Sequence, residues 1–91
     1  MDLQDLRKKI DEIDNNLISL FQQRMDISIE IAQYKKQNNM RIYDPAREQE
    51  ILDKLSHKVK PGRESYITAL YSLLFELSRA EQEKIINSEV M

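Results

Sequence analysis

The chain has 91 residues, enough for one domain and too few for a second hydrophobic core. It contains no cysteine, which excludes disulfides and thiolate chemistry, and its formal net charge of −2 gives no support for nucleic-acid binding. No apolar run approaches the ~18 residues of a membrane span, so we expect a cytoplasmic chain that crosses no membrane.

The first predicted element is a long helix over residues 2–38. Its apolar residues recur at alternating steps of three and four: Leu3, Leu6, Ile10, Ile13, Leu17, Leu20, Ile27, Ile31 and Tyr34. This spacing is typical of a helix that packs along its length against other helices. Asp2 favours the start of the helix, and the pair Asn38-Asn39 favours its end.

One position of this apolar repeat carries a charge. Arg24 lies between Leu20 and Ile27, where the pattern requires an apolar side chain. Burying a guanidinium is costly unless an anion pairs with it. Lys35 lies about 20° from Arg24 around the helix and about 16 Å further along it, so the two cations share a face. They are candidates to hold a small anion, although Lys35 is also typical of a solvated lysine at a helix end.

A second helix is predicted over residues 45–59, after an extended connector. Asp44 is a favourable N-cap residue, and Pro45 suits the first helical position because its missing N–H costs nothing there. Pro61 disfavours a helical conformation at the residue before it, so the helix should end before that point.

A third helix is predicted over residues 63–87, with an apolar stripe that runs from Tyr66 to Ile85 and fraying from Asn87 onward. Ser78 and Gln82 are spaced i, i+4 and share a face beside this stripe. Such residues often only mark the boundary of an apolar surface. The fold class predicted for residues 1–91 is a single all-α domain with a long, a short and a medium helix.

The length of the first helix favours a homodimer. A helix over residues 3–38 is roughly 54 Å long, whereas a compact monomer of this size has a radius of gyration of about 12 Å. The helix would project beyond its own globule and expose its apolar repeat, which a homodimer would cover. Arg7 lies about 25 Å before Arg24 on the helix, so it can join the same small-ligand site only from an antiparallel partner chain.

Eight polar residues, taken in order, provide a more specific signal: Arg7, Arg24, Lys35, Asp44, Arg47, Glu48, Ser78 and Gln82. This set resembles the active-site residues of the all-helical class of chorismate mutase. The local sequence agrees as well, most clearly in the string Tyr43-Asp44-Pro45-Ala46-Arg47-Glu48. The resemblance implies an intertwined homodimer with two equivalent sites, each completed by Arg7 of the other chain, and no metal or cofactor.

The activity that the resemblance implies is the unimolecular rearrangement of chorismate to prephenate, in the biosynthesis of phenylalanine and tyrosine. Chorismate carries two carboxylates, which suit the forked geometry of arginine. By this resemblance, Arg7 of the partner chain and Arg24 would bind the carboxylates, with Ser78 and Arg47 assisting.

The remaining implied roles concern the bond that breaks. The resemblance makes Lys35 and Gln82 the donors to the ether oxygen, which gains negative charge in the transition state. Glu48 would accept a hydrogen bond from the ring hydroxyl, and Asp44 would orient its neighbours. Lys35, Gln82, Glu48 and Arg24 are thus the expected catalytic residues. Because a neutral amide donates without being protonated, we expect a broad pH optimum.

Two alternatives stay open at this point. An isochorismate pyruvate lyase on the same scaffold would bind nearly the same dianion and eliminate pyruvate. A non-catalytic helical dimerisation module would account for the apolar repeat, but not for Arg24 within it. In the resembling family the domain occurs alone and fused to other enzymes, and both arrangements are compatible with this sequence.

Overall fold

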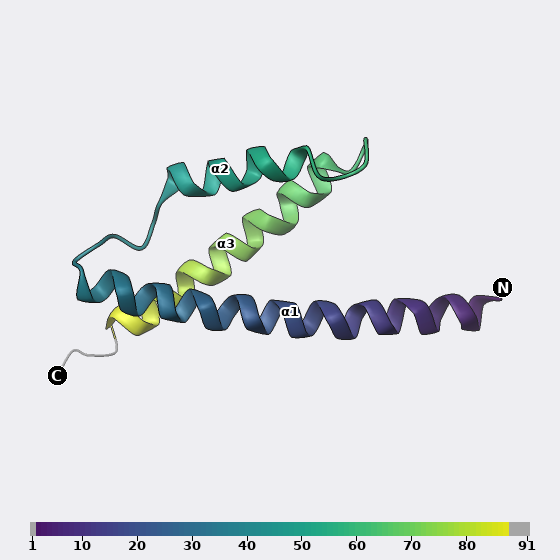
Figure 1. Cartoon of the computed structure of the whole chain (residues 1–91), viewed down its shortest axis with the longest axis horizontal. Helices are drawn as coiled ribbons and strands as arrows, with labels where there is room; N and C mark the ends of the chain where they lie inside the picture. Colours follow the sequence, from purple (N-terminus) through teal and green to yellow (C-terminus); the bar gives the residue numbers. More distant parts are fainter. Residues whose placement is uncertain (1, 88–91) are drawn as a thin grey trace.

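The computed structural model describes residues 2–87, which form α1 (Leu3–Gln37), α2 (Pro45–Ser56) and α3 (Glu64–Asn87) (Figure 1). No strand occurs in this range, so the predicted all-α class with a long, a short and a medium helix is confirmed. α3 crosses the C-terminal half of α1 obliquely, and α2 contacts α3 from the other side (Figure 1). None of the described helices is both long and apolar enough to cross a bilayer.

The helix starts follow the predicted capping residues. Asp2 and Asp5 form a reciprocal capping box, in which the Asp5 N–H donates to Asp2 Oδ1 at 2.9 Å. Asp44 caps α2 by accepting from the Arg47 N–H at 3.0 Å, with Pro45 at the first helical position. These bonds satisfy N–H groups that have no partner inside the helix.

The end of α2 differs from the sequence prediction, which placed it at residue 59. α2 ends at Ser56, and the N–H groups of His57 and Lys58 donate to carbonyl oxygens three residues earlier, at 3.3 and 3.0 Å. This tighter turn replaces the next α-helical turn. Fraying is predicted from Asn87 onward; Asn87 is the last residue of α3, and residues 88–91 lie outside the described range.

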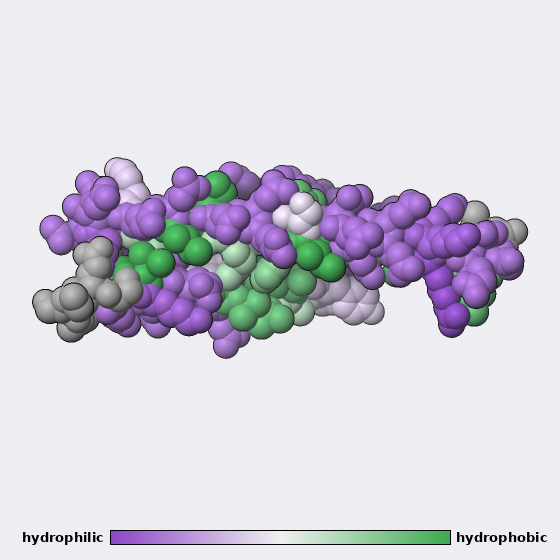
Figure 2. Space-filling model, turned by 90° about the horizontal axis from the view of Figure 1, so that it is seen from below, coloured by the Kyte–Doolittle hydropathy of each residue, from purple (hydrophilic) through white to green (hydrophobic). Residues whose placement is uncertain are grey.

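The N-terminal half of α1 projects away from the rest of the chain (Figure 1). Every residue from 2 to 23 is exposed. The chain measures 58 × 27 × 14 Å with a radius of gyration of 16.7 Å, compared with about 12 Å for a compact chain of this length. Apolar patches lie over the middle of the face seen in Figure 2. A single chain therefore leaves much of its apolar surface in contact with water.

The interior is small and unusually polar. The buried apolar side chains in the described range are Ala32 and Phe75, and the buried polar ones are Ser28, Ser78 and Gln82. α3 thus turns a polar face toward α1.

The predicted apolar stripe of α3 is largely exposed in the single chain, including Tyr66, Leu70, Leu73 and Leu77. These four exposed residues lie on the side of α3 opposite the buried Phe75, Ser78 and Gln82.

The turn before α3 depends on a glycine conformation. Gly62 has φ +91°, and a Cβ placed there would meet no atom within 4 Å. We predict that Gly62→Ala lowers the free energy of unfolding by about 1 kcal/mol, because only the backbone conformation is penalised. Urea denaturation at fixed protein concentration would measure the loss. Gly62→Asn should lose less, since asparagine tolerates positive φ; equal stability of the alanine variant and the wild type would contradict this account.

Candidate active site

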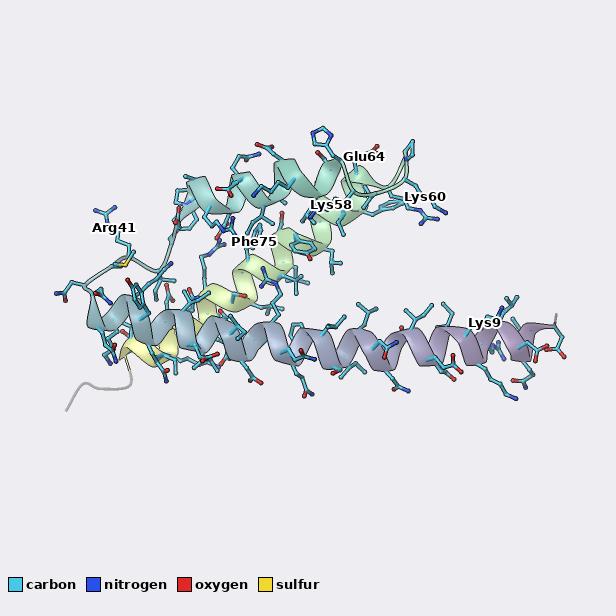
Figure 3. All side chains as sticks on the ribbon, viewed as in Figure 1. Lys9, Arg41, Lys58, Lys60, Glu64 and Phe75 are labelled. Carbon is cyan, nitrogen blue, oxygen red and sulfur yellow. The ribbon has the colours of Figure 1, made fainter. Side chains whose placement is uncertain are left out.

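A cavity of about 580 Å³ opens between α1, the connector before α2, α2 itself and α3. Seven of the eight predicted site residues line it: Arg24, Lys35, Asp44, Arg47, Glu48, Ser78 and Gln82. Apolar side chains complete the wall, namely Ile27, Ile31, Ile42, Ile51 and Phe75. Phe75 lies on α3, on the side that faces this region (Figure 3). The cavity thus combines cations with an apolar surface, which suits a small organic anion.

The side chain of Arg24 contacts three residues of α3. Its Nη1 donates to the Ser78 Oγ at 3.0 Å. The guanidinium carbon lies 5.6 Å from the ring centroid of Tyr71 and 5.8 Å from that of Phe75. Aromatic faces stabilise a partly desolvated cation without neutralising it. Since a guanidinium has five N–H donors, most of the fork stays available to a carboxylate.

Lys35 ties the end of α1 to the connector. Its Nζ donates to the Ile42 carbonyl oxygen at 2.8 Å, and the side chain is half-buried. An ammonium carries three donors, so two more hydrogen bonds can be made. Lys36 has a different role, because its Nζ donates to the carbonyl oxygens of Ile85 and Ile86 near the C-terminal end of α3.

Gln82 is buried against α1, which settles its place as an inner residue and not a boundary one. Its Nε2 donates to both the carbonyl oxygen and the Oγ of Ser28, each at 3.1 Å. Ser28 and the fully buried Ala32 are one turn apart, and their small side chains let α3 approach α1 closely. The sequence interpretation missed Ser28, although it lies one turn after Arg24 on the same face.

The first turn of α2 contributes an exposed arginine. The Arg47 side chain donates to Glu50 Oε1 at 2.8 Å, and the Nζ of Lys54 reaches the same oxygen at 3.0 Å. The hydrogen bond and charge of Lys54, followed by the charge of Arg47, lower the pKa of Glu50. Exposed pairs of this kind contribute little stability, so Arg47 can change partners at small cost.

Arg79 is a cavity residue that the sequence interpretation missed. Its Nη1 donates to Glu48 Oε2, and its guanidinium carbon lies 4.9 Å from the ring centroid of Tyr43. The hydrogen bond to Glu48 raises the pKa of Arg79. Its spacing gives a usable signal, because it follows Phe75 by four residues and precedes Gln82 by three, which places all three on one face of α3.

Arg7 lies outside this cavity. It borders a separate hollow near the start of α1, lined also by Leu3, Gln4, Leu6, Ile10 and Asp11. Within one chain the helix keeps it about 25 Å from Arg24. The described residues contain no group of three or more His, Asp or Glu side chains arranged to hold a metal ion.

The sequence matches the family model of chorismate mutase type II over residues 6–83. It is 33% identical over 86 residues to the chorismate mutase of Methanocaldococcus jannaschii, covering 92% of this chain and 87% of that protein. It is also 36% identical over 88 residues to a bifunctional chorismate mutase/prephenate dehydratase of Buchnera aphidicola subsp. Schizaphis graminum. That alignment covers 94% of this chain but only 23% of the longer relative.

A solved structure agrees with these matches. The crystal structure of chorismate mutase from Helicobacter pylori in complex with prephenate superposes with a TM-score of 0.85 and 37% sequence identity. The similarity covers 98% of this chain and 97% of that one. Because the family match, the relatives and the fold agree over most of the sequence, this chain belongs to the chorismate mutase type II family.

Proposed function

We propose that this chain is an isomerase that rearranges chorismate to prephenate. One observation carries the proposal: a single cavity gathers Arg24, Lys35 and Gln82 in a fold that matches a prephenate-bound chorismate mutase with a TM-score of 0.85. The reaction is unimolecular, so the protein must hold the reactive conformation and stabilise developing charge. The proposal is confined to this reaction, since the chain spans only 23% of its bifunctional relative.

Arg24 is assigned to one substrate carboxylate. The aromatic faces of Tyr71 and Phe75 hold its guanidinium without using up its charge. Ser78 already accepts from Arg24 at 3.0 Å, and its hydroxyl can donate to the same carboxylate. Arg47 assists after releasing Glu50, an exchange between exposed charges.

Lys35 and Gln82 are assigned to the ether oxygen. As the C–O bond breaks, this oxygen gains negative charge, and donors fixed in advance bind it more strongly than they bind the ground state. Lys35 has two donors beyond the one used by Ile42. Gln82 Nε2 donates to the carbonyl oxygen and to the Oγ of Ser28, so in this assignment one of its two N–H groups exchanges the Ser28 Oγ for the ether oxygen of the substrate.

The first turn of α2 is assigned to the substrate ring. Glu48 accepts a hydrogen bond from the ring hydroxyl. Asp44 caps the helix that carries Glu48 and so fixes the orientation of this turn.

The active form is proposed to be an intertwined homodimer in the cytoplasm. Support comes from the exposed residues 3–23 of α1 and from the exposed leucines of α3, which a second copy would cover. If the long helices pack antiparallel, Arg7 reaches the cavity of the other chain and supplies the cation for the second carboxylate. Each site would then be incomplete without its partner.

The activity test compares Lys35→Ala with Lys58→Ala. Lys58 is exposed and does not line the cavity, so its variant should keep wild-type turnover. Lys35→Ala should lower kcat by about a hundredfold or more, the usual effect of removing a donor to an oxyanion. The assay follows the loss of chorismate absorbance and confirms prephenate by acid conversion to phenylpyruvate. Pyruvate and salicylate formed from isochorismate, without prephenate from chorismate, would instead support the lyase.

Replacing Gln82 with glutamate should make the rate depend on pH. A carboxyl group can donate to the ether oxygen only while it is protonated, and its ionised form repels the developing negative charge. We expect the wild-type rate to be nearly constant between about pH 5 and 7.5, and the Gln82→Glu rate to fall as pH rises. Rate profiles of both proteins in one buffer series test this. A wild-type rate that also falls steeply would argue against donation by Gln82.

A mixing experiment tests the contribution of Arg7 across chains. Arg7→Ala and Lys35→Ala should each be nearly inactive alone. After unfolding and refolding together in equal amounts, half of the dimers are mixed, and each mixed dimer has one complete site. The mixture should therefore recover about a quarter of the wild-type activity. If Arg7 acted within its own chain, no complete site would form and the mixture would stay inactive.

A further inference from the structure

Arg79 connects three elements at the edge of the cavity. It projects from α3, binds Glu48 in the first turn of α2, and lies against the ring of Tyr43 in the connector. The side chains of Arg79 and Glu48 are 33% and 23% exposed, so the pair is neither deeply buried nor freely solvated. Arg79 is not among the eight residues suggested by the family resemblance.

We propose that Arg79 is a positioning residue, which holds the Glu48 carboxylate in the orientation that accepts the ring hydroxyl of the substrate. This inference rests on the proposed mutase function and extends it by a residue that acts through Glu48.

The geometry leaves Glu48 able to perform this role. Arg79 engages Oε2, one of two carboxylate oxygens that together offer about four lone-pair sites. An accepting site therefore remains for a substrate hydroxyl. A glutamate side chain is flexible, and a guanidinium fixed by a second contact restricts it. Tyr43 provides that contact, with its ring centroid 4.9 Å from the guanidinium carbon.

The charge of the cavity also explains why Glu48 is paired with Arg79. The cavity is lined by four cationic side chains, Arg24, Lys35, Arg47 and Arg79, and two anionic ones, Asp44 and Glu48, which leaves an excess of two positive charges. In the proposed dimer, Arg7 of the partner chain would add a third positive charge, so the site would attract a dianion. A carboxylate such as Glu48 repels a dianionic ligand unless a cation compensates it. Arg79 is the cation that directly contacts Glu48.

The test is a double-mutant cycle on kcat/KM for chorismate, with Arg79→Met, Glu48→Gln and the double variant. Arg79→Met should lower kcat/KM by about tenfold to a hundredfold, the range for losing a charged hydrogen bond. In the Glu48→Gln background the same substitution should change kcat/KM by less than about threefold, because Arg79 then has no carboxylate to hold. An equal loss in both backgrounds would overturn the proposal and indicate that Arg79 contacts substrate or only supports folding.

Two further variants separate position from stability. Arg79→Lys keeps the positive charge but lacks the forked guanidinium, so it should retain more activity than Arg79→Met. If Arg79→Met does not fold, Arg79→Lys replaces it in the double-mutant cycle. Arg41→Met is the matched control, since Arg41 is exposed and points away from the helices (Figure 3). Equal kcat/KM for Arg79→Met, Arg41→Met and wild type would overturn the inference alone. An inactive wild-type protein would overturn the proposed function.

Discussion

The fold and the site both depend on the polar contact between α1 and α3. The bonds from Arg24 to Ser78 and from Gln82 to Ser28 each join residues 54 positions apart in the sequence. A buried polar group left without a partner costs about 1–3 kcal/mol, so these bonds favour one register of α3 along α1. The same register brings the cations of α1 opposite Ser78 and Gln82 of α3. The contacts that fix the register of the two helices therefore also place the site residues.

This use of a polar interface explains where the apolar surface lies. Ser28, Ser78 and Gln82 take up much of the small interior, and many leucines are therefore exposed on the surface of the single chain. Exposed leucines lie on the half of α1 that projects from the rest of the chain and on the exposed side of α3. In the proposed dimer they supply the hydrophobic stabilisation that the single chain lacks, while the polar interface supplies the chemistry.

The cations of the cavity are held in two different ways. Arg24 and Lys35 are fixed by a hydroxyl, aromatic rings and a carbonyl oxygen, none of which carries a formal charge. Their charge therefore remains available to an anionic ligand. Arg79 is instead paired with Glu48, and the pair is close to neutral toward a ligand. The first arrangement suits binding of carboxylates, and the second suits orientation of a hydroxyl.

Three features could be predicted from the sequence alone: the three helices, their caps at Asp2 and Asp44, and the common face of Arg24 and Lys35. These features are local, because helical periodicity and capping follow from residues within a few positions of each other. The family resemblance added the set of site residues, of which the structure gathers all but Arg7 in one cavity. The buried face of α3 and the hydrogen-bond partners of Ser28 and Arg79 could not be predicted in this way and became known from the folded chain. Those outcomes depend on how the helices cross, since Arg79 meets Glu48 across 31 residues of sequence and no local pattern encodes that distance.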